Sequence, residues 1–210
     1  MRAHEAVDPA ARQRFEATIT EAERHSAGEI VLVVTHACDE YGSAGWRFAV
    51  LLAGLVFAGL AAFAPPLETW IYLAAQALAL GAGHALARID AVRRRLLPEA
   101  LVEASVAERA RRAFAEHGLT RTQGQTGILV FVALLERRVV VLADAGIHRH
   151  VGTNDVWQEV VDLAVAGLRE GCAVDGLDAA LRRCGELLRR HVPAPDHNPN
   201  ELPDRVVLED

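Results

Sequence analysis

The stretch EIVLVVTHA, residues 29–37, decides the fold that the sequence predicts. It is a short apolar run, rich in β-branched residues, in which polar and apolar side chains do not alternate. Alternation marks a strand with one solvated face, so its absence favours a central strand that is covered on both faces. The preceding segment, residues 8–25, has the spacing of a helix, with Asp8 as N-cap and Pro9 at the first helical position.

Two further apolar runs lie in the second half of the chain. GILVFVALL at residues 127–135 and RVVVLA at residues 138–143 are joined by Glu136 and Arg137, which predicts an antiparallel β-hairpin. Helical spacing at residues 98–117 places a helix between the first strand and this hairpin. Because a long crossover of this kind normally joins parallel neighbours, we expect the first two strands to pair in parallel.

Two more helices are predicted after the strands, one around residues 157–168 and one at residues 178–191. Helices and strands in this order predict an α/β fold, a compact sandwich of three or four strands with helices on both faces. Residues 193–210 are rich in Pro, Asn and Asp and lack a long apolar run. We expect them to form a partly ordered C-terminal tail.

A long apolar insert interrupts this pattern. FAVLLAGLVFAGLAAFAPPL, residues 48–67, contains no ionisable group, and a second uncharged run follows at residues 69–87. At about 1.5 Å of rise per residue, each run is long enough to span the roughly 30 Å of a bilayer's hydrocarbon. Pro65 and Pro66 between them end the first helix and start a tight turn. The insert therefore predicts a transmembrane helical hairpin over residues 45–88.

The alternative is a pair of buried helices in a soluble core. A chain of 210 residues is too small to surround two helices that show no polar face, so the membrane interpretation is favoured. Both helices carry small residues that allow close packing in lipid. They are Gly54, Ala58, Gly59 and Ala62 in the first run, and Ala75, Ala79 and Gly83 in the second.

Arginine counts predict the orientation of the hairpin. Its open end carries five arginines, whereas the turn carries no basic residue. The positive-inside rule then places both chain termini in the cytoplasm of a two-pass protein of the bacterial inner membrane. Four of these arginines are candidates either for binding anionic lipid headgroups or for acting as a topology signal alone. They are Arg88, Arg93, Arg94 and Arg95.

This organisation divides the chain into four parts. Residues 1–40 and 89–192 form the two parts of one α/β domain, residues 45–88 form the hairpin, and residues 193–210 form the tail. The formal net charge of −6 gives no electrostatic reason to expect nucleic acid as a partner. Three cysteines without a CxxC pair disfavour a disulfide framework or a structural zinc site.

Several segments in this order and spacing resemble the TPM domain family. They are residues 26–34 (SAGEIVLVV), 127–133 (GILVFVA), 136–138 (ERR) and 144–148 (DAGIH). The tail sequence NELP at residues 200–203 resembles the ending of the membrane-anchored, largely uncharacterised bacterial branch of that family. The resemblance covers about residues 8–38 and 98–191, on either side of the insert.

The resemblance implies a Rossmann-like α/β/α sandwich, here interrupted by the hairpin. It also implies two kinds of chemistry, because weak acid phosphatase activity and calcium binding have been attributed to some members. Many members carry an Asp-Asn pair before the glycine of the second strand, whereas this chain has Gln125 and Thr126 there. A carboxylate ligand is therefore missing at that point.

Three carboxylates are candidate ligands of a divalent cation such as calcium. Asp144 follows a strand, where α/β sheets often bind ligands, while Glu29 begins the first strand and Glu136 lies in the hairpin turn. A hard cation needs several such oxygens to converge. The alternative for Asp144 is a turn residue that accepts a hydrogen bond from its own backbone. No cofactor is required by any motif in the sequence.

The sequence leaves two functions open. The first is a membrane-anchored TPM-like protein that acts without catalysis as an assembly or regulatory partner at the cytoplasmic face. Besides lipid, its expected partner is another membrane protein or a second copy, because two helices are too few to form a transport pathway alone. The second is a weak metal-assisted phosphatase with Asp144 as one ligand.

Overall fold

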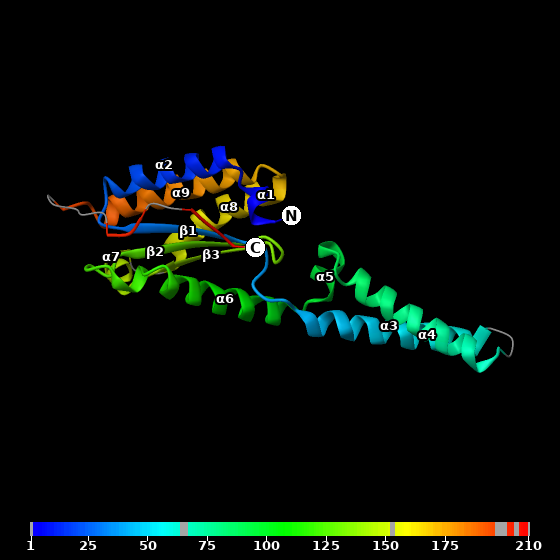
Figure 1. Ribbon diagram of the computed structural model, residues 1–210. Helices are drawn as coiled ribbons and strands as arrows, with labels where there is room; N and C mark the ends of the chain where they lie inside the picture. Colours follow the sequence, from blue (N-terminus) through cyan, green and yellow to red (C-terminus); the bar gives the residue numbers. More distant parts are fainter. Residues whose placement is uncertain (1, 64–66, 152–153, 196–200, 204–205, 210) are drawn as a thin grey trace. The chain divides into compact units, whose positions relative to one another are not determined.

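The structure of the chain is a computed structural model that describes residues 2–63, 67–151, 154–195, 201–203 and 206–209 (Figure 1). The chain divides into two compact units. We call Met1–Cys38 together with Ala104–Asp210 the sandwich unit, and Asp39–Glu103 the hairpin unit. Each is described by itself.

The sandwich unit contains a four-stranded mixed sheet in the order β3-β2-β1-β4. The strands are β1 (Glu29–Thr35), β2 (Gly127–Ala133), β3 (Arg138–Ala143) and β4 (Val206–Glu209). β1 pairs in parallel with β2 and β4, and β2 pairs antiparallel with β3. The predicted α/β class, the central first strand, its parallel partner and the β-hairpin are therefore confirmed.

Helices cover both faces of the sheet (Figure 1). One face carries α2 (Pro9–Glu23), α8 (Gln158–Glu170) and α9 (Ala173–His191), and the other carries α6 (Glu99–Glu116). Two short α-helices and two 3-10 helices complete the described part of the unit. They are α1 (Ala3–Ala6), α7 (Ala145–Val151) and the 3-10 helices Leu119–Arg121 and Asn154–Trp157.

Every residue of β1 and β2 is buried, as the lack of alternation predicts. Successive side chains of a strand point to opposite faces, so each strand contributes to two layers of the core. Leu32 of β1 belongs to the layer that contains Phe15 of α2 and Leu181 of α9. Phe131 of β2 is fully buried and has the opposite parity in its strand, on the face that α6 covers (Figure 1).

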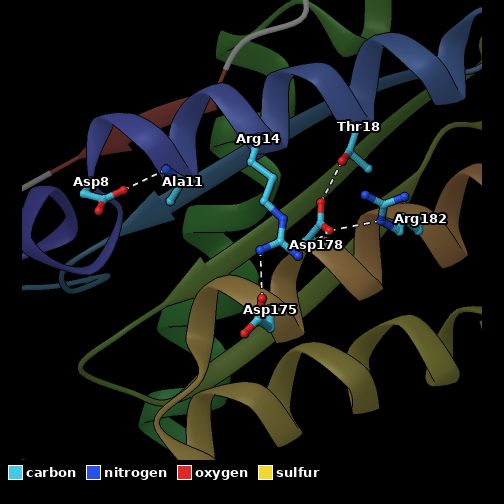
Figure 2. A network of polar contacts seen from close by, with 7 residues as sticks. All are labelled: Asp8, Ala11, Arg14, Thr18, Asp175, Asp178 and Arg182. Carbon is cyan, nitrogen blue, oxygen red and sulfur yellow. Dashed lines mark hydrogen bonds and ion pairs between the residues drawn. The ribbon is translucent and has the colours of Figure 1, made fainter.

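The helix that precedes β1 begins as its sequence predicts. Asp8 adopts an extended conformation at the N-cap, and its Oδ1 accepts a 2.7 Å hydrogen bond from the backbone N–H of Ala11 (Figure 2). Pro9 occupies the first turn, where its missing N–H leaves no hydrogen bond unmade. The cap therefore satisfies one of the backbone donors that every helix start leaves without an intrahelical partner.

The tail contributes a strand that the sequence analysis did not predict. Val206–Glu209 forms β4 beside β1, and Pro193 makes an isolated β-bridge with Ser26. The run VVLE is too short to stand out as a strand on its own. β2 pairs with one edge of β1, and without β4 the backbone groups of the other edge would be unpaired. The tail forms a strand because this edge offers it backbone hydrogen bonds.

The hairpin unit contains α3 (Gly42–Phe63), α4 (Thr69–Leu86) and α5 (Asp90–Leu96). α3 and α4 pack closely, because a Cβ built on Gly83 would lie 2.7 Å from the Cα of Ala49. Ala53 and Ala79 are buried with them. The predicted Pro65-Pro66 turn lies outside the described residues.

Two of the three small residues predicted for α4 are buried in this seam and the third, Ala75, is half-buried, but those of α3 differ. Ala79 and Gly83 are buried, whereas Gly54 and Ala58 are exposed. Ala49 and Ala53 take the expected place of these two residues. The helical period explains the error, because residues 49 and 53 are one turn apart on one face while 54 and 58 lie on a neighbouring face.

Candidate functional site

Asp144 directly precedes α7 at the amino-terminal edge of the parallel strands. Its Oδ1 accepts a 2.7 Å hydrogen bond from the N–H of Ala145, and its carbonyl oxygen accepts one from the N–H of His148. Because β3 runs antiparallel to β2, its last residue lies beside the start of β2, where the N–H of Asp144 donates to Gly127. Asp144 therefore does not lie at the carboxyl ends of β1 and β2, where ligands of α/β sheets usually bind.

Glu29 lies at the same edge and binds the tail. Its side chain is 4% exposed, and its two oxygens accept 3.1 Å hydrogen bonds from the backbone N–H groups of Glu201 and Leu202. The Glu201 carboxylate in turn accepts a 2.8 Å hydrogen bond from the N–H of Gln123. These contacts fix the segment that leads to β4.

Glu136 lies at the opposite edge of the sheet. Its Oε1 accepts a 2.9 Å hydrogen bond from the N–H of Cys38, just beyond β1. The length of a seven-residue strand, about 20 Å, separates this edge from Glu29 and Asp144. The structure therefore does not bring the three candidate ligands to one point, and the described residues contain no group of three or more His, Cys, Asp or Glu side chains that can hold a metal ion.

A buried carboxylate on α9 forms the centre of the most connected polar network in Figure 2. Asp178 is 2% exposed and accepts a 2.6 Å hydrogen bond from the Thr18 hydroxyl. Arg14 and Arg182 donate to its other oxygen at 2.9 and 3.0 Å. Arg14 also donates to Asp175 at 2.8 Å, so the network joins α2 to the first two turns of α9.

These contacts determine the charge state of the network. Burial alone raises the pKa of Asp178, but the hydrogen bonds from Thr18, Arg182 and Arg14 outweigh it and hold the pKa below its ordinary value. Hydrogen bonds to Asp175 and Asp178 raise the pKa of Arg14. The network is therefore a charged connection between α2 and α9 in which both carboxylate oxygens of Asp178 accept hydrogen bonds.

A shallow groove of about 560 Å³ lies beside this network, between α2 and α9. Its rim carries Arg182 and Arg189 on α9 with Glu21 on α2. The helices meet closely at its base, because a Cβ on Gly185 would lie 2.6 Å from that of Ala22.

The hairpin unit holds a basic cluster whose members have different surroundings. Arg93 donates to the backbone oxygens of Asp39 and Glu40, and its guanidinium lies 5.4 Å from the ring centroid of Tyr41. Arg88 and Arg95 are exposed and Arg94 is half-buried. Across the part of the chain that the structure describes, these last three form no ion pair and no hydrogen bond through their side chains.

The network around Asp178 was not among the predicted sites. The sequence predicts residue 178 as the start of the last helix, whereas α9 begins at Ala173. Thr18 and Asp178 are 160 residues apart in the chain, so no local spacing connects them. The one available signal was a lone acidic residue among the core positions of an amphipathic helix.

Neither a family model nor a curated protein matches this chain. A solved structure that it resembles is the NMR structure of BA42 protein from the psychrophilic bacterium Bizionia argentinensis. The two share 16% sequence identity with a TM-score of 0.58, over 97% of this chain and 95% of the other. At this identity the likeness shows the fold alone.

Proposed function

We propose that the chain is a two-pass membrane protein whose sandwich unit acts in the cytoplasm as a non-enzymatic assembly or regulatory partner. The observation that carries this proposal is the exposure of the apolar side chains of the hairpin unit. Leu51, Phe63 and Leu78 are 72%, 91% and 75% exposed. A water-soluble protein rarely leaves so many large apolar side chains in contact with solvent.

The dimensions of α3 support the same proposal, and among the described residues it is the one helix that is by itself long and apolar enough to cross a membrane. α3 has 22 residues, which at about 1.5 Å per residue spans the roughly 30 Å of bilayer hydrocarbon. Only 11% of its most apolar 18-residue window is buried. The core helix of a soluble domain has a similar length and composition but is mostly buried, so this exposure argues for lipid as the solvent of α3.

The arginines at the open end of the hairpin support the proposed orientation. Arg47 lies in the second turn of α3, and the other four lie after the end of α4. Two spans return the chain to the side on which it started. The positive-inside rule therefore supports a cytoplasmic position for both termini, with the turn on the outer side.

The role of the sandwich unit rests on what a two-helix anchor can do. Two helices do not enclose a pathway for a solute, so a function in the membrane requires another membrane protein or a second copy. The proposed kinship with the membrane-anchored TPM branch, and its Rossmann-like α/β/α sandwich, supports the same kind of role. The weak metal-assisted phosphatase stays a prediction.

Protease accessibility in spheroplasts tests the orientation. Tags at the N-terminus and C-terminus should resist protease outside intact spheroplasts, while a tag inserted between Phe63 and Leu67 should be cleaved. Lysed spheroplasts provide the control, because all three tags must then be cleaved. Cleavage of either terminal tag in intact cells contradicts the proposal.

An enzymatic assay distinguishes the two functions. For a non-enzymatic partner, the purified protein releases no phosphate from an aryl phosphate with any divalent ion. Release that is lost in Asp144→Ala and retained in Asp8→Ala would favour the phosphatase instead. The pair is matched, because Asp8 and Asp144 both accept hydrogen bonds at a helix start.

A further inference from the structure

We propose that α5 lies along the membrane surface and that Arg88, Arg94 and Arg95 bind the headgroups of anionic phospholipids. The inference rests on the proposed membrane anchoring of α3 and α4. It adds a lipid class and divides the basic cluster into residues with different roles. The first observation is the bend of 98° between α4 and α5.

The bend fixes the direction of α5 once α4 spans the bilayer. A transmembrane helix is tilted on average by about 20° from the membrane normal. A helix that follows it at nearly a right angle therefore runs close to the plane of the membrane. The break between Leu86 and Asp90 is only three residues long, so α5 stays at the depth where α4 ends.

Aromatic and apolar side chains mark this depth as the interface. Trp46, 57% exposed, stacks on His84 in the last turn of α4 with the ring centroids 4.7 Å apart. Tryptophan is enriched where hydrocarbon meets headgroups. Leu86 at the end of α4 and Ile89 before α5 are 43% and 51% exposed, and they supply apolar surface that a headgroup region can cover.

The arginines of this segment are not equivalent. Arg93 donates to two backbone oxygens and lies above Tyr41, so it holds α5 to the segment before α3. Arg88, Arg94 and Arg95 have no such contacts among the residues that the structure describes. Asp90 is the acidic residue on α5, and four arginines surround it in residues 88–95. The excess positive charge is complementary to an anionic lipid surface.

Phosphate groups match the free guanidinium groups in chemistry and in reach. A guanidinium donates two parallel hydrogen bonds to phosphate oxygens, and a surface-lying helix presents it at headgroup depth. Each basic residue near an anionic surface strengthens attachment roughly fivefold, so three give about 100-fold at low salt. The attachment weakens as salt screens the charges.

Hydrogen exchange of the full chain in lipid nanodiscs tests the proposal. Discs of phosphatidylcholine are compared with discs of three parts phosphatidylcholine and one part phosphatidylglycerol. We expect the amides of residues 88–96 to exchange at least about tenfold more slowly in the anionic discs, and high salt to remove the difference. The variant Arg88→Gln/Arg94→Gln/Arg95→Gln should exchange at one rate in both discs.

A matched control removes three exposed arginines from the sandwich unit instead. Arg24→Gln/Arg111→Gln/Arg112→Gln deletes the same charge at positions that are 60% to 69% exposed. This variant should keep the lipid-dependent difference. If it loses the difference as the first variant does, net charge rather than α5 is responsible, and the proposal is overturned.

The same data separate this proposal from the anchoring on which it rests. Protection of the α3 amides in both kinds of disc with equal exchange of α5 overturns headgroup binding and leaves the anchor intact. Unprotected α3 amides in both discs overturn the anchor and the headgroup proposal with it. If inorganic phosphate slows the exchange of α5 equally in neutral discs, the cluster is a general anion site and the lipid proposal fails.

Discussion

The sandwich unit and the hairpin unit use the same apolar residue types in opposite surroundings. In β1 and β2, Val33 and Phe131 are fully buried on the face of the sheet that α6 covers. In α3, Leu51 and Leu55 are 72% and 71% exposed. The comparison teaches that apolar composition alone does not decide burial: helices cover a strand of seven residues on both faces, whereas a helix of 22 residues keeps most of its apolar side chains exposed.

Truncation of one side chain in each unit gives the largest contrast. Phe131→Ala should lower the free energy of unfolding of the sandwich unit by about 3–5 kcal/mol, because it leaves a cavity in the core. Leu55→Ala in α3 should change it by less than about 0.5 kcal/mol. Denaturant titration of the full chain in a mild detergent, followed by circular dichroism, measures both. Equal losses would remove the distinction between the two units.

The second prediction concerns the polar connection inside the sandwich unit. Asp178→Ala should cost about 2–3 kcal/mol, because Arg14, Arg182 and Thr18 lose a charged or short hydrogen bond at a buried acceptor. Asp175→Ala is the control, since its side chain is 71% exposed and shares only Arg14. It should cost no more than about 1 kcal/mol in the same titration.

The stabilisation by Asp178 depends on pH with a definite sign. Its pKa is lower in the folded protein than in the unfolded chain, so the folded state binds fewer protons in the acid range. The contribution is present above the ordinary Asp pKa of about 4 and is lost as the pH falls through the lower, folded value. The free energy of unfolding of Asp178→Ala should therefore fall less steeply with decreasing pH in the acid range than that of the parent chain. Equal slopes for the two proteins would contradict this assignment.

Two glycines of α4 sharpen the comparison within the hairpin unit. A Cβ at Gly83 would lie 2.7 Å from the Cα of Ala49, whereas no atom lies within 4 Å of one at Gly81. Gly83→Ala should thus separate α3 from α4 and cost about 1–3 kcal/mol. Gly81→Ala should be neutral or stabilise the helix, by up to about 1 kcal/mol. Thermal unfolding in detergent compares the stability of the two variants. Equal stability would contradict close packing of α3 against α4 at Gly83.

The smallest effect is expected at the tail. Glu29→Gln removes the charge that two backbone N–H groups share, at a cost of about 1 kcal/mol. The amides of β4 should then exchange faster, while those of β2 keep their protection. Glu5→Gln is the control, because the Glu5 carboxylate accepts its hydrogen bond from the nearby N–H of Arg2. Unchanged exchange of β4 would show that the strand pairing alone holds the tail.

Local patterns in the sequence were enough to predict the elements with strong local signals. β-branched runs predicted β1, β2 and β3, and the Asp8-Pro9 pair predicted the start of α2. The strand β4 escaped notice, since its four residues acquire their conformation from β1. The position of Asp144 depends on the direction of β3. Because β3 runs antiparallel to β2, as the sequence predicts, its last residue lies at the amino-terminal edge of the parallel strands and not at their carboxyl ends.

Contacts between distant parts of the chain could not be predicted from local sequence patterns. The Glu29 carboxylate binds backbone groups 172 and 173 residues away, and backbone groups carry no mark in a sequence. A carboxylate at a strand start therefore looks the same whether it binds a cation or a tail. Arg93 and Arg94 are neighbours of the same type, and only the structure separates the one that holds α5 from the one left to solvent.

Alkaline carbonate extraction of membranes from cells that express the full chain tests the central claim most directly. Carbonate releases proteins that are bound at the surface and leaves those that span the bilayer. With α3 and α4 in lipid, the chain stays in the membrane pellet after high-speed centrifugation. Recovery of the intact chain in the supernatant would contradict the proposed anchor.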